Sequence, residues 1–111
     1  MGAVPLRQTE ASVASTVARA RREHVRWLCL LYLDQGRPAT MTDSALLPMV
    51  RADYPDADAV ELRRALDYLD SRGLLSITKD GARWHLRLTY QGVDLVEYTS
   101  PDAPGIGRPP V

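Results

Sequence analysis

The chain has 111 residues, and its 14 Lys and Arg balance 14 Asp and Glu, so the formal net charge at pH 7 is zero. This length suits a single domain, and 45% hydrophobic with 25% charged residues is typical of a globular protein. The neutral charge provides no overall field that would attract nucleic acid. A single cysteine, Cys29, excludes a disulfide within the chain, and no group of Cys and His has metal-site spacing. We therefore expect a cytoplasmic protein without a metal or cofactor.

The longest apolar run covers residues 27–33, whereas a membrane-spanning helix needs about 20 residues. Basic residues precede the run, as in a secretory signal, but it leads into Asp34-Gln35-Gly36 rather than a cleavage site with small residues. We expect neither a membrane span nor a signal peptide, and we interpret the run as part of a core helix.

In chain order, residues 1–8 lack periodicity and are expected to be loose. Helix-forming residues begin at Thr9, which can cap a helix. The pattern leaves open whether residues 9–21 form a separate helical arm or continue into a helix over residues 22–35. Gly36 and Pro38 end that helix, and its apolar last turns predict a central position in the fold.

A second helix is expected to start near Thr42 or Asp43 and to end before Pro55, with Pro48 in or just beyond its first turn. The third helix is the clearest in the chain. It begins at Asp56 or Asp58, ends at Arg72-Gly73, and carries an apolar stripe. The stripe consists of Leu62, Leu66 and Leu69.

Residues 74–79 and 82–88 predict a β-hairpin around Asp80-Gly81, a dipeptide that favours a two-residue turn. This turn places Ile77 opposite Trp84. All the apolar side chains then lie on one face of the hairpin, and a slip by one residue would mix them with the polar ones. Thr89 is expected to cap a short helix that Gly92 weakens.

Residues 100–111 contain four Pro and two Gly, which predicts an extended tail without a core of its own, either a spacer or a ligand for a partner groove. The elements before the tail, residues 9–99, match a winged helix-turn-helix domain. This is an α+β, mainly α fold with three helices, a two-stranded hairpin as the wing and a short closing helix.

Several segments resemble small winged-helix proteins of Mu-like transposable phages and prophages. The resemblance covers residues 22–110 and includes the tail segment Pro104-Gly105-Ile106-Gly107-Arg108-Pro109-Pro110. It implies a regulator or accessory factor that binds DNA, and some such proteins are encoded near packaging genes. The other segments are Arg26-Trp27-Leu28, Tyr54-Pro55-Asp56-Ala57, Glu61-Leu62-Arg63-Arg64, Leu66-Asp67-Tyr68-Leu69 and Gly92-Val93-Asp94-Leu95-Val96-Glu97-Tyr98.

The charges give this hypothesis mixed support. Residues 38–73, which contain the expected helix-turn-helix, hold four Arg against seven acidic residues, a net charge of −3. On the third helix, Arg63 and Arg64 are the candidate DNA contacts; alternatively, they pair with Asp67 or Asp70 on a solvated face. The wing adds further candidates, although such charges also block strand pairing at a sheet edge. These are Lys79, Arg83, His85 and Arg87.

Two further groups are candidates for contact with the DNA backbone or with a protein partner. One is the basic cluster before the apolar run, which can also meet the acidic helix-turn-helix of another copy. Its members are Arg19, Arg21, Arg22 and Arg26. The other group is in the tail and consists of Ile106 and Arg108.

No catalytic constellation is evident in the sequence. His24 and His85 have no nucleophile or carboxylate that the sequence places beside them, and Cys29 lies inside the apolar run. We therefore expect a protein that is not an enzyme and that binds double-stranded DNA as a homodimer. The alternative is a protein–protein interaction module in phage assembly or packaging, with a phage protein as its partner.

Overall fold

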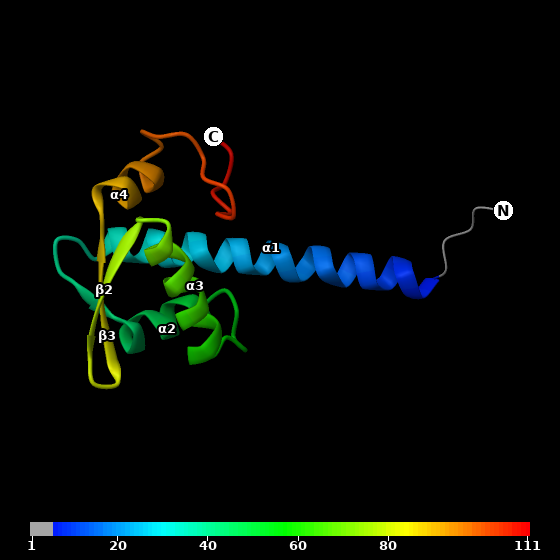
Figure 1. The fold of residues 1–111 in the computed structure, drawn as a ribbon, viewed down its shortest axis with the longest axis horizontal. Helices are drawn as coiled ribbons and strands as arrows, with labels where there is room; N and C mark the ends of the chain where they lie inside the picture. Colours follow the sequence, from blue (N-terminus) through cyan, green and yellow to red (C-terminus); the bar gives the residue numbers. More distant parts are fainter. Residues whose placement is uncertain (1–5) are drawn as a thin grey trace.

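The computed structural model describes residues 6–111, with side chains from residue 10 onward. Over these residues the fold is α+β and mainly helical, with four helices and one three-stranded antiparallel sheet (Figure 1). The helices are α1 (Leu6–Gln35), α2 (Asp43–Arg51), α3 (Ala59–Ser71) and α4 (Tyr90–Val96). The strands are β1 (Met41–Thr42), β2 (Leu75–Asp80) and β3 (Arg83–Leu88).

The first helix, α1, is one continuous helix of 30 residues. It begins at Leu6, so residues 6–8 are helical rather than loose, and Thr9 lies inside the helix instead of capping it. Residues 1–5 lie outside the described part of the chain. No Gly or Pro interrupts residues 6–35, which explains why the expected arm and the core helix form a single element. The second half of α1 is buried in the body, whereas the first half projects from it (Figure 1).

The predicted starts of α2, α3 and α4 and the predicted end of α3 are confirmed. The side chains of Thr42, Asp58 and Thr89 each accept a hydrogen bond from the backbone N–H three residues later. After α3, Gly73 takes a φ of 72°, the left-handed conformation that glycine adopts most easily. These helix boundaries are set by contacts between residues close together in the chain.

The hairpin of β2 and β3 is confirmed, but its predicted register is wrong by two residues. Ile77 pairs with Leu86 rather than with Trp84, and the turn is Gly81-Ala82 rather than Asp80-Gly81. Gly81 has a φ of 59° at the first turn position, where a two-residue turn with one positive φ requires glycine. Because the shift is an even number of residues, every side chain stays on its predicted face.

The sheet also contains a strand that the sequence analysis missed. β1 pairs antiparallel with β3, Met41 opposite Leu86 and Thr42 opposite His85, so the sheet order is β1-β3-β2 and the wing is not an isolated hairpin. β1 has only two residues, too few for an alternating pattern to reveal it.

The apolar face of the sheet packs with the helices around one core. Leu86 and Leu75 from the sheet are buried with the predicted stripe of α3 and with Cys29 and Leu30 of α1. Within residues 6–111, no helix combines the length and the hydrophobicity needed to cross a lipid bilayer.

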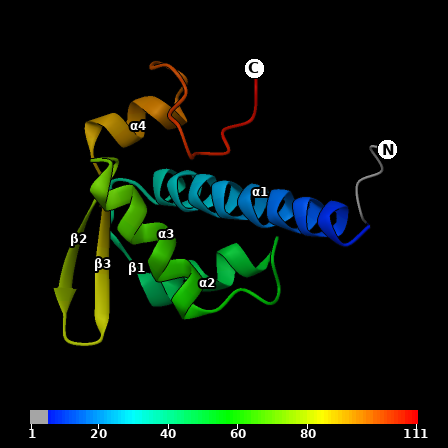
Figure 2. The same cartoon turned by 45° about the vertical axis from the view of Figure 1, so that its right-hand side comes forward.

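The tail is packed against the body, a contact that the sequence analysis did not predict when it described an extended tail without a core of its own. The chain returns from α4 to the side of α1 (Figures 1 and 2), where Ile106 is buried in the core. The Gly107 N–H donates to the Glu23 carbonyl oxygen at 2.9 Å. A side chain at Gly107 would come within 3.0 Å of the α1 backbone, so glycine permits this close approach.

Candidate functional site

The exposed ridge of α3 carries one unpaired cation. Val60, Arg64 and Asp67 follow one another at helical spacing on the side opposite the buried Leu stripe, and all three are exposed. Among the described residues, Arg64 makes no ion pair. The ridge therefore offers one guanidinium group to an anion, next to an exposed apolar side chain.

Arg63, the other candidate on α3, is held by the protein itself. Its Nε donates to Asp43 Oδ2 at 2.9 Å, and its Nη2 donates to the carbonyl oxygen of Ala82 in the wing turn. Its guanidinium also lies 4.6 Å from the centre of the Trp84 ring. Neither Asp67 nor Asp70 is its partner. Arg63 thus joins α3 to α2 and to the wing.

Asp43, at the start of α2, receives these contacts in a site where its side chain is almost fully buried. Burial of the carboxyl group favours its neutral form, but hydrogen bonds from the Trp84 N–H and from Arg63 outweigh burial and lower the Asp43 pKa. The carboxylate therefore satisfies one backbone group of β3 and one guanidinium of α3. We call Asp43, Arg63, Ala82 and Trp84 the wing anchor.

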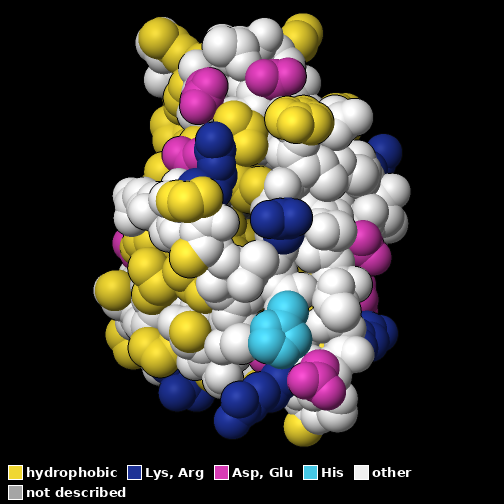
Figure 3. All heavy atoms as spheres, turned by 90° about the vertical axis from the view of Figure 1, so that its left-hand side faces the viewer, with side chains coloured by type: hydrophobic (Ala, Val, Ile, Leu, Met, Phe, Trp, Pro, Cys, Tyr) yellow, Lys and Arg dark blue, Asp and Glu magenta, His cyan; other side chains and the backbone are white. Residues whose placement is uncertain are grey.

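The wing presents three predicted residues on the outer face of β3, namely Arg83, His85 and Arg87, and the two arginines are exposed. His85 Nε2 lies 4.0 Å from Asp80 Oδ2. Lys79 is on the other face, with its Nζ 4.6 Å from the centre of the Trp84 ring. Figure 3 shows basic side chains toward the lower end of the sheet surface, interrupted by an acidic one.

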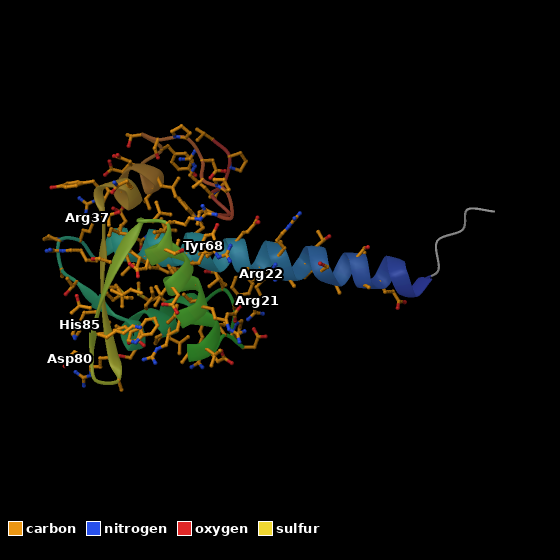
Figure 4. All side chains as sticks on the ribbon, in the orientation of Figure 1. Arg21, Arg22, Arg37, Tyr68, Asp80 and His85 are labelled. Atoms are coloured by element: carbon orange, nitrogen blue, oxygen red, sulfur yellow. The ribbon has the colours of Figure 1, made fainter. Side chains whose placement is uncertain are left out.

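The basic cluster on α1 is divided by the fold. Arg21 forms ion pairs with Glu61 at 2.7 Å and with Asp56 at 2.9 Å, which raise the Arg21 pKa. Arg21 therefore meets the acidic helix-turn-helix of its own chain, whereas the sequence analysis considered that of another copy as one possible partner of the cluster. Arg19 and Arg22 are exposed (Figure 4 labels Arg21 and Arg22), and neither makes an ion pair with a described residue.

Arg26 and the two tail candidates form internal contacts. The Arg26 guanidinium lies 3.6 Å from the centre of the Tyr68 ring and donates to the Gly105 carbonyl oxygen at 2.9 Å. Arg108 donates to the carbonyl oxygens of Leu95 and Ser100, and Ile106 is buried. These three residues hold the tail on the body and are poorly placed to contact a partner.

Chemically reactive groups are sparse in this structure. Burial raises the pKa of the Cys29 thiol to about 12, so the thiol stays protonated at neutral pH. His24 Nδ1 lies 2.7 Å from the Tyr54 hydroxyl oxygen. Among the described residues, no three His, Cys, Asp or Glu side chains gather closely enough to hold a metal ion.

Sequence reasoning missed the wing anchor because its members come from three separate places in the chain, the start of α2, the middle of α3 and the wing. In the sequence, the position of Asp43 predicts a helix cap only, and the Ala82 carbonyl carries no sequence signal. The one available signal was an acidic residue at the start of α2 next to a helix rich in arginine.

Comparison of the chain with protein-family models, with curated proteins and with solved structures found no match.

Proposed function

We propose that this chain is a winged helix-turn-helix protein that binds double-stranded DNA through α3 and the wing. The element order supports this, because α2 and α3 form a helix pair that the β2–β3 hairpin follows, and the short β1 pairs with β3. The observation that carries the proposal is the wing anchor. Arg63 connects the wing turn directly to the first half of α3, so this half of α3 lies beside the wing turn.

The proposed contact surface is smaller than the sequence alone predicts. Arg64 on α3 and Arg83 and Arg87 on the outer face of the wing are the contacts, and Lys79 adds a cation on the opposite face near the wing turn. Arg63 positions the wing and does not itself reach the duplex. A few exposed arginines contact phosphates more readily than they discriminate bases, so we expect binding with low sequence specificity and strong salt dependence.

Fluorescence anisotropy with a mixed-sequence duplex at several salt concentrations tests this proposal. We expect measurable binding at low salt and a slope of log affinity against log salt of about −3 to −4, because each phosphate contact contributes about 0.9. The double variant Arg83→Ala/Arg87→Ala should reduce the magnitude of this slope by about 2. Arg72→Ala removes the same type of charge at the other end of α3 and should leave the slope unchanged. Absence of binding at low salt would contradict the proposal.

A phage or prophage setting for this function is also a proposal, and the sequence resemblance alone supports it. A cytoplasmic location is likewise a proposal, supported by the single cysteine.

The second candidate function is a protein–protein interaction module in phage assembly or packaging. It is favoured by the acidic residues of the helix-turn-helix, since Asp58, Asp67 and Asp70 are exposed and would repel a phosphate backbone. Sizing of the chain with a candidate phage protein, in the absence of DNA, distinguishes this function from the first.

A further inference from the structure

A cleft of about 490 Å³ lies between α1 and the first half of α3, where the projecting part of α1 meets the body. Its volume is within the range of about 300–1,000 Å³ that is usual for small-molecule sites in proteins. Val25 and Ala65 in its lining are buried, and Ala18 and Val60 extend the apolar lining toward solvent. The cleft therefore offers an apolar surface and enough room for a small molecule.

Two arginines in the lining, Arg22 of α1 and Arg64 of α3, face each other across this cleft. One turn further along both helices, the Arg26 guanidinium lies 3.6 Å from the centre of the Tyr68 ring. The helices pass each other in the same general direction, because Arg21 pairs with the first turn of α3. Arg22 and Arg64 each precede one member of the Arg26–Tyr68 contact by four positions and so lie on the same sides of their helices. Figure 4 labels Arg21, Arg22 and Tyr68 where α1 passes α3.

The carboxylates that line the cleft already have partners within the chain. Two of them pair with Arg21, and Asp58 accepts a backbone N–H at the start of α3. Arg22 and Arg64 are exposed, and neither forms an ion pair with a described residue. An anion between them would offset the repulsion of two like charges and would accept charge-assisted hydrogen bonds from both.

The tail closes one end of the cleft. Arg26 donates to the Gly105 carbonyl oxygen at 2.9 Å, and Tyr68 donates to the Pro104 carbonyl oxygen at 2.9 Å. An extended peptide could not continue past this end without displacing the tail. The cleft is therefore better suited to a compact molecule than to a peptide.

We infer that the cleft between α1 and α3 is a binding site for a small organic anion with an aromatic or aliphatic body. The acidic group lies between Arg22 and Arg64, and the apolar body lies against Ala18 and Val60. Arg64 also belongs to the proposed DNA contact surface. The inference does not depend on DNA binding, however, because its test uses only the full chain and the small molecule.

Fluorescence titration of the full chain with anilinonaphthalene sulfonate tests the inference, because this probe joins one acidic group to an aromatic body. Phenylnaphthylamine has the same aromatic body without the sulfonate and serves as the neutral probe. We expect saturable binding of one sulfonate probe per chain, and binding of the neutral probe that is weaker by at least about tenfold. Absence of saturable binding, or equal affinity for the two probes, would overturn the inference.

Two double variants locate the charged part of the site. Arg22→Ala/Arg64→Ala should weaken binding of the sulfonate at least about tenfold and change binding of the neutral probe by less than about twofold. Arg19→Ala/Arg72→Ala removes the same charge from exposed positions of α1 and the end of α3 that do not line the cleft, and it should change neither affinity. All four side chains are exposed, so thermal unfolding of both variants should match that of the wild type. Equal losses of affinity in the two variants would show that only net charge matters and would contradict the site.

A second pair of variants locates the apolar part. Val60→Asp places a carboxylate in the lining of the cleft and should weaken binding of the sulfonate by about three- to tenfold, through like-charge repulsion and loss of apolar contact. Val17→Asp adds the same charge at a similarly exposed position outside the lining, since Val17 is 62% and Val60 is 58% exposed, and it should have little effect. If the two variants bound the sulfonate equally well, the probe would lie elsewhere and the inference would be wrong.

Discussion

At the scale of single residues, the fold gives several arginines structural tasks. Arg21, Arg26 and Arg63 bind acidic, aromatic or carbonyl groups of the same chain, which removes them from the set of free cations. Arg64 and Arg83 have no such internal partner among the described acidic residues. A count of basic residues in the sequence therefore overestimates the charge available to a nucleic acid.

Asp43 supports a prediction about stability at this scale. Asp43→Asn should lower the free energy of unfolding at neutral pH by about 1–3 kcal/mol, because the amide cannot replace a carboxylate that pairs with Arg63 in a buried site. The Asp43 pKa is lowered in the folded state, so its contribution is complete above the unfolded-state pKa of about 3.9 and is lost as the pH falls through the folded-state value.

Urea unfolding as a function of pH measures this effect. The difference between wild type and Asp43→Asn should be constant from about pH 5 to pH 8 and should shrink below about pH 4. Asp67→Asn changes an exposed carboxylate that has no ion pair among the described residues, so it should alter stability by less than about 0.5 kcal/mol. An equal loss in both variants would refute the role of Asp43 in the wing anchor.

At the scale of elements, α4 shows a glycine whose importance lies in a contact rather than in helix propensity. The sequence predicts only that Gly92 weakens this helix. In the structure, a Cβ at position 92 would lie 2.0 Å from the carbonyl oxygen of Leu74, which also accepts the Thr89 N–H. The absence of a side chain lets α4 pack directly on the start of β2.

Gly92→Ala should consequently destabilise the protein by about 1–3 kcal/mol, although alanine is the better helix former. Gln91→Ala, at an exposed neighbouring position of the same helix, should be neutral or slightly stabilising. Thermal unfolding followed by circular dichroism compares the two variants. If Gly92→Ala were as stable as wild type, α4 would not be in close contact with Leu74.

At the scale of the whole molecule, the tail closes the fold. It crosses from α4 to α1, where Tyr68 donates to the Pro104 carbonyl oxygen and Ile106 enters the core. Gly105 has a φ of 79°, which turns the tail backbone at this contact. The tail thereby connects α4 to α1 and α3.

Ile106→Ala should lower the free energy of unfolding by about 2–5 kcal/mol, the usual cost of truncating a buried isoleucine. Val111→Ala truncates a fully exposed aliphatic side chain in the same tail and should change stability by less than about 0.5 kcal/mol. Chemical denaturation of both variants provides the comparison. An Ile106→Ala variant of wild-type stability would show that the tail is not part of the core.

The features that the sequence determined by itself are local ones. The caps Thr42, Asp58 and Thr89 bind groups three residues away, and strand alternation keeps side chains on the same faces of the hairpin when the register shifts by two residues. The tertiary structure decided the two-residue register shift, the pairing of β1, the Asp43–Arg63 contact and the position of the tail. Asp43 and Arg63 are 20 residues apart, and Arg26 and Gly105 are 79 apart. Such contacts form only when distant segments are packed together. The short-range patterns that define helices, turns and strand faces carry no information about them, so they could not be predicted from the sequence.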